Sequence, residues 1–184
     1  MGRGQPLRLM SDAPATPAPQ RPLWRIGLGA ALIALAVDQA AKLWLVHGYD
    51  LGRRGAVALT PFLDLILTWN SGISYGWFQT TSTAGQWLLL GVKGFAVVVL
   101  AWWMAHASTR IAVIGLGLII GGAIGNAIDR LVYGAVVDFA LLHVQMAGKT
   151  YYWYVFNLAD AAIVAGVIGL LYDSVVGDAA VKAP

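Results

Sequence analysis

The residues of this chain that could do chemistry are polar side chains set within or beside long apolar stretches. Such groups are costly in a membrane and tend to be functional. Residues three or four apart in a helix are neighbours, so members of each set share a helical face. The sets are Asp38 with Lys42, Asn126 with Asp129 and Arg130, and Asn157 with Asp160, and Asp138 lies in the loop before the last set.

An aspartate pair is the chemistry that the composition favours. All nine acidic residues are aspartates, the chain has no cysteine, and the three histidines are too far apart for a local metal motif. Two carboxylates that share one proton can hydrolyse an amide, because the ionised member polarises a water while the protonated member protonates the carbonyl oxygen. Asp138 and Asp160 are the candidates, since neither has an adjacent basic residue. We expect no metal and no other cofactor.

Simpler roles are open for several of the other polar residues. Asp38 and Lys42 could form a plain ion pair within one helix, and Arg130 could only reach toward lipid headgroups. For Asp129, we expect a structural ion pair with its neighbour Arg130. Lys93 lies inside an apolar stretch with no acid nearby in sequence, so it pairs across helices, reaches toward water or marks an error in the expected span limits.

A serine hydrolase is not indicated by the sequence. Ser71 and Ser74 lie outside any Gly-x-Ser-x-Gly motif, and neither is followed by lysine at helical spacing.

Four apolar stretches are long enough to carry these groups across a membrane. The chain has 184 residues, 59% hydrophobic and 11% charged, whereas a soluble domain is about 25% charged. Spanning a hydrocarbon core takes about 20 residues, which predicts a polytopic membrane protein with four helices. The expected spans are 24–46, 84–104, 111–128 and 156–176.

The polar sets on the first, third and fourth spans then lie at the same depth. The alternative for the first stretch is a secretory signal peptide, but its apolar pattern continues past Asp38 and Lys42 and is too long for a signal core.

The segments outside the spans differ in composition. Residues 1–23 hold five of the seven prolines and are expected to form a disordered tail, and residues 177–184 form a second tail. Basic residues near the span ends place both tails in the cytoplasm. The long loops contain two β-leaning runs, 56–60 and 63–69, and an aromatic run, 151–154, that is typical of a membrane-interface belt.

A stripe of small residues marks the third span. Gly117, Gly121 and Gly125 recur every fourth residue, a pattern that lets another helix approach closely.

Five segments of the chain, in order, resemble the motifs of bacterial lipoprotein signal peptidase, signal peptidase II. They are Val37-Asp38-Gln39-Ala40-Ala41-Lys42, Asn70-Ser71-Gly72-Ile73-Ser74-Tyr75-Gly76, Gly121-Gly122-Ala123-Ile124-Gly125-Asn126-Ala127-Ile128-Asp129-Arg130, Gly134-Ala135-Val136-Val137-Asp138-Phe139 and Phe156-Asn157-Leu158-Ala159-Asp160. The match covers residues 37–160. It departs from the usual pattern at Ser74 and Tyr75, where the family has alanine and phenylalanine, and each departure adds a hydroxyl.

The resemblance implies an all-α polytopic aspartyl peptidase of four transmembrane helices with a small extracytoplasmic β-structured cradle. It implies cleavage of diacylglyceryl-modified prolipoproteins just before the lipidated cysteine, at a site near the outer face of the bacterial inner membrane. Asp138 and Asp160 correspond to the family's catalytic pair. The positions that correspond to site supports or substrate contacts are Asp38, Lys42, Asn70, Gly72, Asn126, Asp129, Arg130 and Asn157.

The expected partners are therefore the lipoprotein precursors and membrane lipid. We expect a monomer, and no nucleic-acid partner, because the sequence has no block rich in lysine and arginine. Two other classes of function are alternatives: a small transporter, for which four spans without repeat symmetry are a thin scaffold, and a noncatalytic assembly subunit.

Overall fold

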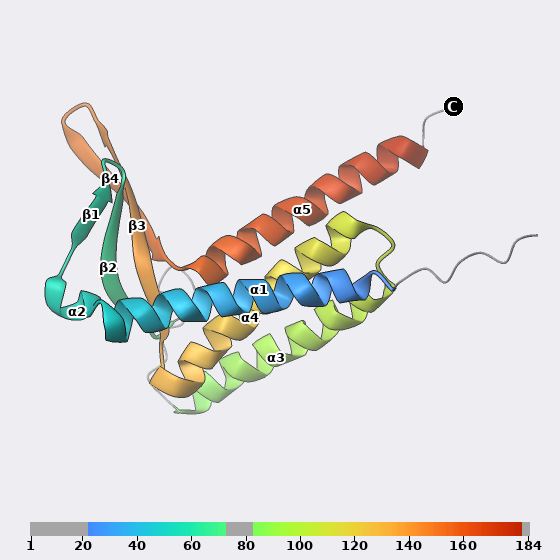
Figure 1. The fold of residues 1–184 in the computed structure, drawn as a ribbon, viewed down its shortest axis with the longest axis horizontal. Helices are drawn as coiled ribbons and strands as arrows, with labels where there is room; N and C mark the ends of the chain where they lie inside the picture. Colours follow the sequence, from blue (N-terminus) through green and yellow to red (C-terminus); the bar gives the residue numbers. More distant parts are fainter. Residues whose placement is uncertain (1–21, 73–82, 182–184) are drawn as a thin grey trace, which may run out of the picture.

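The computed structural model describes residues 22–72 and 83–181, so most of the expected N-terminal tail, Ser74 and Tyr75 lie outside the described residues. Long helices form a bundle, and a β-sheet covers one of its ends (Figure 1). The elements are α1 (Trp24–Leu43) with a π-helical turn (Trp44–Gly48), α2 (Leu51–Arg54), β1 (Val57–Thr60), β2 (Leu63–Asn70), α3 (Thr83–His106), α4 (Arg110–Tyr133), β3 (Val136–Met146), β4 (Lys149–Phe156) and α5 (Leu158–Val181).

Apolar helices of membrane-spanning length form most of the bundle. Within the described residues, three segments are long and apolar enough to cross a membrane: Trp24–Gly48, Arg110–Tyr133 and Leu158–Val176. A shorter apolar segment, Leu90–His106, belongs to α3. The chain is thus a membrane protein with three long apolar helices and one shorter one.

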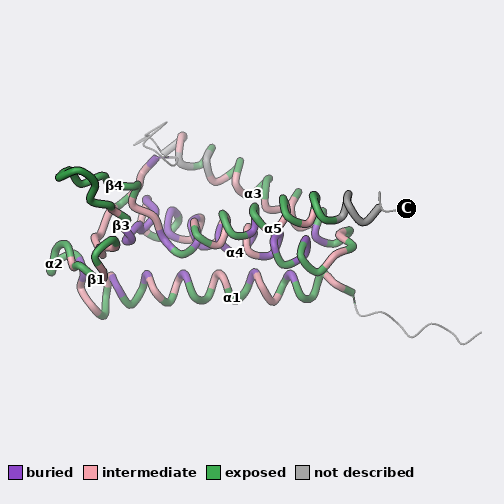
Figure 2. The backbone as a smooth tube through the Cα atoms, turned by 90° about the horizontal axis from the view of Figure 1, so that it is seen from above, coloured by how far each residue is buried: buried purple, intermediate pink, exposed green. Residues whose placement is uncertain are grey.

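Helix α4 is the centre of the bundle, and buried residues gather along it (Figure 2). It packs against α1, α3 and α5. Gly117 and Gly121 face α1, where a Cβ at Gly121 would collide with the carbonyl oxygen of Ala31, so the absence of a side chain lets the two backbones meet. The predicted packing role of these two glycines is confirmed, whereas Gly125 faces the carboxylate of Asp38.

The fold is not purely all-α, because a four-stranded antiparallel sheet with the order β1-β2-β3-β4 covers one end of the bundle. Strands β1 and β2 fall on the two β-leaning runs. The residue pattern indicates no strand in the loop that carries the aromatic run 151–154, but β3 and β4 form a hairpin there. Its outer half is exposed on both faces, so the run Tyr151–Tyr154 shows no apolar–polar alternation that would have indicated a strand.

The junctions between helices and strands bring the polar residues to the sheet end of the bundle. Helix α4 ends at Tyr133 and is capped by Gly134, whose φ of 75° suits a left-handed C-cap, and β3 begins two residues after this glycine. Strand β4 passes directly into α5 through Asn157. Asp138 on β3 and Asp160 on α5 therefore both lie close to the end of α4.

Candidate active site

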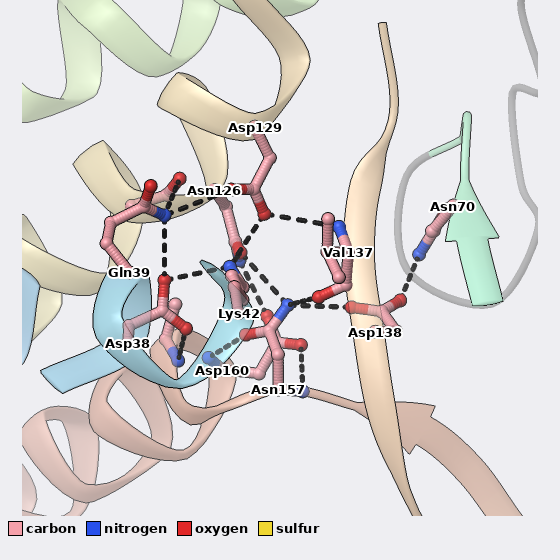
Figure 3. A network of polar contacts seen from close by, with 12 residues as sticks. Asp38, Gln39, Lys42, Asn70, Asn126, Asp129, Val137, Asp138, Asn157 and Asp160 are labelled. Carbon is pink, nitrogen blue, oxygen red and sulfur yellow. Dashed lines mark hydrogen bonds and ion pairs between the residues drawn. The ribbon is translucent and has the colours of Figure 1, made fainter. Parts of the chain in front are cut away.

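The polar sets from α1, α4 and α5 meet beside β2 and β3, as the sequence predicts (Figure 3). Most side chains of these sets are buried, and Asp160 is the member that is partly exposed. The buried polar residues are Asp38, Lys42, Asn126, Asp129, Arg130, Asp138 and Asn157.

Lys42 is the hub of the cluster. Its ammonium lies 2.8 Å from a carboxylate oxygen of Asp38 and 2.7 Å from one of Asp129, and it donates to the side-chain oxygen of Asn126 at 3.0 Å. A lysine has three N–H donors, and these contacts use all of them. The Asp38–Lys42 pair is therefore more than an intrahelical ion pair. The expected ion pair of Asp129 is made with Lys42 on α1, and not with the adjacent Arg130.

The two carboxylates that pair with Lys42 also bind the backbone of neighbouring elements. Asp38 accepts a hydrogen bond from the Ala159 N–H at 2.9 Å, which joins α1 to the first turn of α5. Asp129 accepts one from the Val137 N–H at 3.1 Å, which joins α4 to β3. These bonds fix the residues next to Asp160 and Asp138.

Two asparagines connect this cluster to the candidate catalytic aspartates. Asn126 accepts from Lys42 and donates to Oδ1 of Asp160 at 2.8 Å. Asn157 donates from Nδ2 to Oδ1 of Asp138 at 2.7 Å and to the side-chain oxygen of Asn126 at 3.0 Å. Each aspartate thus accepts a hydrogen bond from a buried amide whose orientation is fixed by its own partners.

Asn157 and Asp160 also form a reciprocal cap at the start of α5. The Asp160 N–H donates to Oδ1 of Asn157 at 2.9 Å, and the Asn157 N–H donates to Oδ2 of Asp160 at 3.2 Å. This is the capping-box arrangement, which satisfies two N–H groups that a helix N-terminus leaves without partners. The first turn of α5 therefore holds the Asp160 carboxylate in place.

Asp138 lies on β3, where β2 supplies a further contact. Asn70 donates from Nδ2 to Oδ2 of Asp138 at 3.0 Å. The two residues lie on neighbouring strands, where Asn70 is directly opposite Val136. Burial raises the pKa of Asp138 from its ordinary value of 3.8 to about 6, and repulsion by Asp160 acts in the same direction. The hydrogen bonds from Asn70 and Asn157 and the charge of Lys42 lower this pKa and only partly offset burial. A proton is therefore retained on Asp138 well above the ordinary range.

Arg130 secures the segment that follows β2. Its guanidinium donates to the carbonyl oxygens of Gly72 and, at 3.4 Å, of Ser71, while the Gly72 N–H donates to the side-chain oxygen of Asn70 at 3.1 Å. Only 4% of Arg130 is exposed, so the alternative that it merely reaches toward headgroups is wrong. The arginine instead fixes the backbone next to Asn70.

Sequence reasoning missed two members of the network. The Gln39 side chain donates to Asp129 at 3.0 Å, to Asp38 at 3.2 Å and to the Gly125 carbonyl at 3.2 Å. Gln39 could have been identified from the sequence, because it is a polar residue next to Asp38 inside an apolar span. The Val137 N–H had no such signal, because a backbone donor is not visible in residue types.

Lys93 lies near this cluster as well. It lies four and seven residues before Val97 and Leu100, so the three residues share one face of α3. Val97 and Leu100 pack against the bundle core. The Lys93 ammonium is repelled by Arg130 and Lys42 and attracted by Asp160 and Asp138. Among the described residues Lys93 forms no ion pair, so the prediction that it pairs across helices is not confirmed.

The arrangement is suited to acid–base chemistry by two carboxylates. Asp138 is 3% exposed and bound by two amides, whereas Asp160 is partly exposed at a helix start. Different environments of this kind separate the proton affinities of paired carboxylates. Within residues 22–72 and 83–181, no three histidine or aspartate side chains gather as a metal site.

Comparisons with known proteins identify the chain's relatives. A family model described as signal peptidase (SPase) II matches residues 30–176. The chain is 65% identical over 160 residues to the lipoprotein signal peptidase of Rhodopseudomonas palustris (strain TIE-1), and 68% identical over 160 residues to that of Nitrobacter hamburgensis. Each alignment covers 87% of this chain and 98% of the relative.

The fold also resembles that of a solved bacterial membrane enzyme. The TM-score is 0.69 at 22% identity, over 85% of this chain and 91% of the other. At this identity the likeness concerns the fold alone. The family and the close relatives favour a peptidase over the transporter and the assembly subunit that the sequence left as alternatives.

Proposed function

Because the chain belongs to the signal peptidase II family and has lipoprotein signal peptidase activity, we propose that Asp138 and Asp160 are the catalytic pair. The observation that carries this proposal is the shared support of the two carboxylates by Asn157, which bonds to both. Asp138 and Asp160 are also the carboxylates of the cluster that form no ion pair with a described residue, unlike Asp38 and Asp129.

The two aspartates divide the work of amide hydrolysis. Asp138 holds the proton, since burial and the charge of Asp160 raise its pKa to about 6, and it donates this proton to the carbonyl oxygen of the scissile amide. Asp160, which is more exposed, accepts a proton from the attacking water. The water oxygen bonds to the amide carbon as its proton passes to Asp160, and Asp160 then gives this proton to the leaving nitrogen as the C–N bond breaks. Asp138 takes back its proton from the hydroxyl that was the carbonyl oxygen, so both aspartates return to their starting states.

The surrounding residues position this pair. Lys42 neutralises Asp38 and Asp129, which in turn hold the backbone at Ala159 and Val137, each next to a catalytic aspartate. Asn126 and Asn157 orient the carboxylates, because catalytic groups must be held by neighbours whose own conformations are fixed. Arg130 and Asn70 hold the backbone at Gly72, which we assign to substrate contact.

The substrate class is a diacylglyceryl-modified prolipoprotein, cut on the N-terminal side of the lipidated cysteine. A site at the end of an apolar bundle supports this assignment, because the acyl chains can stay in hydrocarbon while the amide reaches the polar cluster. Depth in the membrane then selects the bond. The enzyme acts as a monomer.

The protein is a multi-pass bacterial membrane enzyme, and we assign it four spans, with α3 as the second. Both ends of the described chain lie at the end of the bundle opposite the sheet, which supports placing both termini on one side (Figure 1). The basic residues of the N-terminal tail make that side the cytoplasm. The catalytic pair and the sheet then lie at the outer face of the inner membrane.

Cleavage of purified precursors tests the catalytic roles and the substrate class together. The wild-type protein in detergent should cleave a diacylglyceryl-modified prolipoprotein and leave the unmodified precursor intact, and Asp160→Asn should cleave neither. Asp50→Asn is the matched control, because Asp50 is a half-exposed aspartate that pairs with Arg53 outside the cluster. Turnover by Asp160→Asn at the rate of this control would exclude the proposed pair.

A further inference from the structure

A crevice lies at the end of the bundle opposite the catalytic cluster. Its volume is about 620 Å³, and its walls come from the end of α3, the α3–α4 turn, the first turn of α4 and residues 167–174 of α5. Most of the wall is apolar, and the polar side chains on it are those of His106, Ser108, Thr109, Asp173 and Ser174. Neither the catalytic chemistry nor its supports use this crevice.

Asp173 gives the crevice its negative charge. Its carboxylate accepts a hydrogen bond from the Thr109 hydroxyl at 2.8 Å. In the described part of the chain, no basic side chain forms an ion pair with it. The nearest basic residue along the chain from Thr109 is Arg110, which is exposed, and the His106 ring on the opposite wall contacts the Trp102 carbonyl. A partly buried carboxylate without a cation favours a positively charged ligand.

An apolar stripe on α5 joins this crevice to the catalytic cluster. Asp160, Val164, Val167, Leu171 and Ser174 follow one another at spacings of four and three residues, so they share one helical face. Val164 is 58% exposed and Leu171 63%. The last three residues of the stripe line the crevice. A helix lying along this stripe would touch apolar side chains from the catalytic end to the crevice.

The length of the stripe matches the anatomy of a signal peptide. Asp160 and Asp173 are 13 residues apart on one helix, which is about 20 Å at 1.5 Å per residue. A signal peptide has a positively charged n-region followed by an apolar h-region of about 7–15 residues, or about 10–22 Å as a helix. When its cleavage site is at the catalytic pair, its basic n-region reaches the level of Asp173.

We propose that the stripe on α5 binds the h-region of the substrate's signal peptide and that Asp173 in the crevice binds the basic n-region. This inference rests on the proposed catalytic pair and orientation, and it adds a second recognition site about 20 Å from the scissile bond. The n-region ammonium or guanidinium pairs with the Asp173 carboxylate, because the hydrogen bond from the Thr109 hydroxyl leaves other lone pairs of that carboxylate open for a cation.

Substrate charge and enzyme charge are varied together to test this pairing. The probes are two synthetic diacylglyceryl-modified precursor peptides in a nonionic detergent, one with two lysines in the n-region and one with glutamines in their place. For the wild type, KM should be about two- to fivefold higher with the glutamine peptide, as expected for one partly exposed ion pair, with kcat unchanged. Asp173→Asn should give one KM for both peptides.

Two control variants separate charge from packing. Thr109→Val removes the hydrogen bond to Asp173 and the side-chain N-cap that accepts from the Ala112 N–H, but it keeps the carboxylate, so it should retain the preference for the lysine peptide. Asp50→Asn removes an acid at the other end of the bundle and should retain it as well. Equal KM values for both peptides in the wild type, as an acyl chain in the crevice would give, or an unchanged preference in Asp173→Asn, would overturn the proposal.

Loss of the preference in Thr109→Val would also contradict the proposed pairing, because it would trace the effect to packing of the α3–α4 turn. Failure of the catalytic pair is a separate result. It would appear as cleavage by Asp160→Asn, whereas the n-region pairing is measured as a ratio of KM values in active enzymes.

Discussion

Asn157 contacts both candidate catalytic carboxylates: its side-chain amide donates to Asp138 at 2.7 Å, and its backbone N–H donates to Asp160 at 3.2 Å. The residue is at once the last position before α5 and a buried link to β3 through the Val137 carbonyl. One asparagine therefore fixes the relative position of a strand carboxylate and a helix carboxylate.

Replacing this link should reduce catalysis far more than stability. Asn157→Ala removes the orienting bond to Asp138 and the side-chain cap on α5. We expect a loss of about 100-fold in kcat/KM, as for catalytic groups displaced by about 1 Å, and of about 1 kcal/mol in the free energy of unfolding, as for a lost N-cap. Cleavage kinetics and thermal unfolding in detergent measure the two effects.

Leu158→Ala is the positional control, because Leu158 is adjacent and 38% exposed. It should retain nearly full activity. An Asn157→Ala enzyme as active as this control would refute the positioning role.

The ion pairs of Lys42 should be far more important for stability than a surface pair. Lys42→Met leaves Asp38 and Asp129 buried without their cation, and breaking a buried pair in this way costs about 3–5 kcal/mol. Arg53→Met breaks the exposed pair with Asp50, which is worth about 0–1 kcal/mol. Thermal unfolding of both variants in the same detergent compares them, and equal shifts in Tm would contradict the structural role of Lys42.

The pH dependence of catalysis should report the proton on Asp138. With one shared proton required, kcat/KM should fall as the pH rises through about 6, where Asp138 loses its proton. Asn70→Ala removes a hydrogen bond that stabilises the charged form, so the alkaline limb should move up by about one pH unit. Thr60→Ala, which alters a hydroxyl at the β1–β2 turn, should leave the limb unmoved.

A limb that stays in place or moves down in Asn70→Ala would contradict this assignment. The same group affects stability. Because its folded-state pKa lies above 3.8, Asp138 contributes stability that is fully present below about pH 3.8 and is lost as the pH rises through about 6.

Glycines that join the helices should tolerate no side chain, unlike glycines that face outward. Gly121→Leu would force α4 away from Ala31 on α1, whereas an added Cβ at Gly29 meets nothing within 4 Å. Overpacking of this kind costs about 1–3 kcal/mol. We expect a lower Tm for Gly121→Leu only. A similar decrease for Gly29→Leu would indicate that tight packing is not the reason for the effect.

The sequence could predict features that depend on local pattern. Apolar length identified the helices, and spacing along each helix brought Asp38, Lys42, Asn126 and Asp160 to one depth, where the structure joins them by hydrogen bonds and ion pairs. The strand that ends at Asn70 was also predicted up to residue 69, because the run 63–69 is rich in strand-forming residues.

Features that depend on tertiary geometry could not be predicted. The pairing of Asp129 with Lys42 crosses from α4 to α1, and the Val137 N–H acts through its backbone. The outer half of the β3–β4 hairpin showed no alternation, because both of its faces are exposed. Its tight turn at Ala147 and Gly148, both with positive φ, contains only one residue that favours this conformation.

The most direct test of the catalytic pair is whether its two members act as one unit. Asp138→Asn, Asp160→Asn and the double variant are compared in single-turnover cleavage of a diacylglyceryl-modified precursor, with a chelator present and with folding checked by thermal unfolding. Residues that act as a unit are strongly non-additive, so each single variant should lose as much activity as the double. A double variant whose loss of activity equals the product of the two single losses would contradict the proposal that Asp138 and Asp160 share the reaction. Cleavage at the wild-type rate by either single variant would contradict it as well.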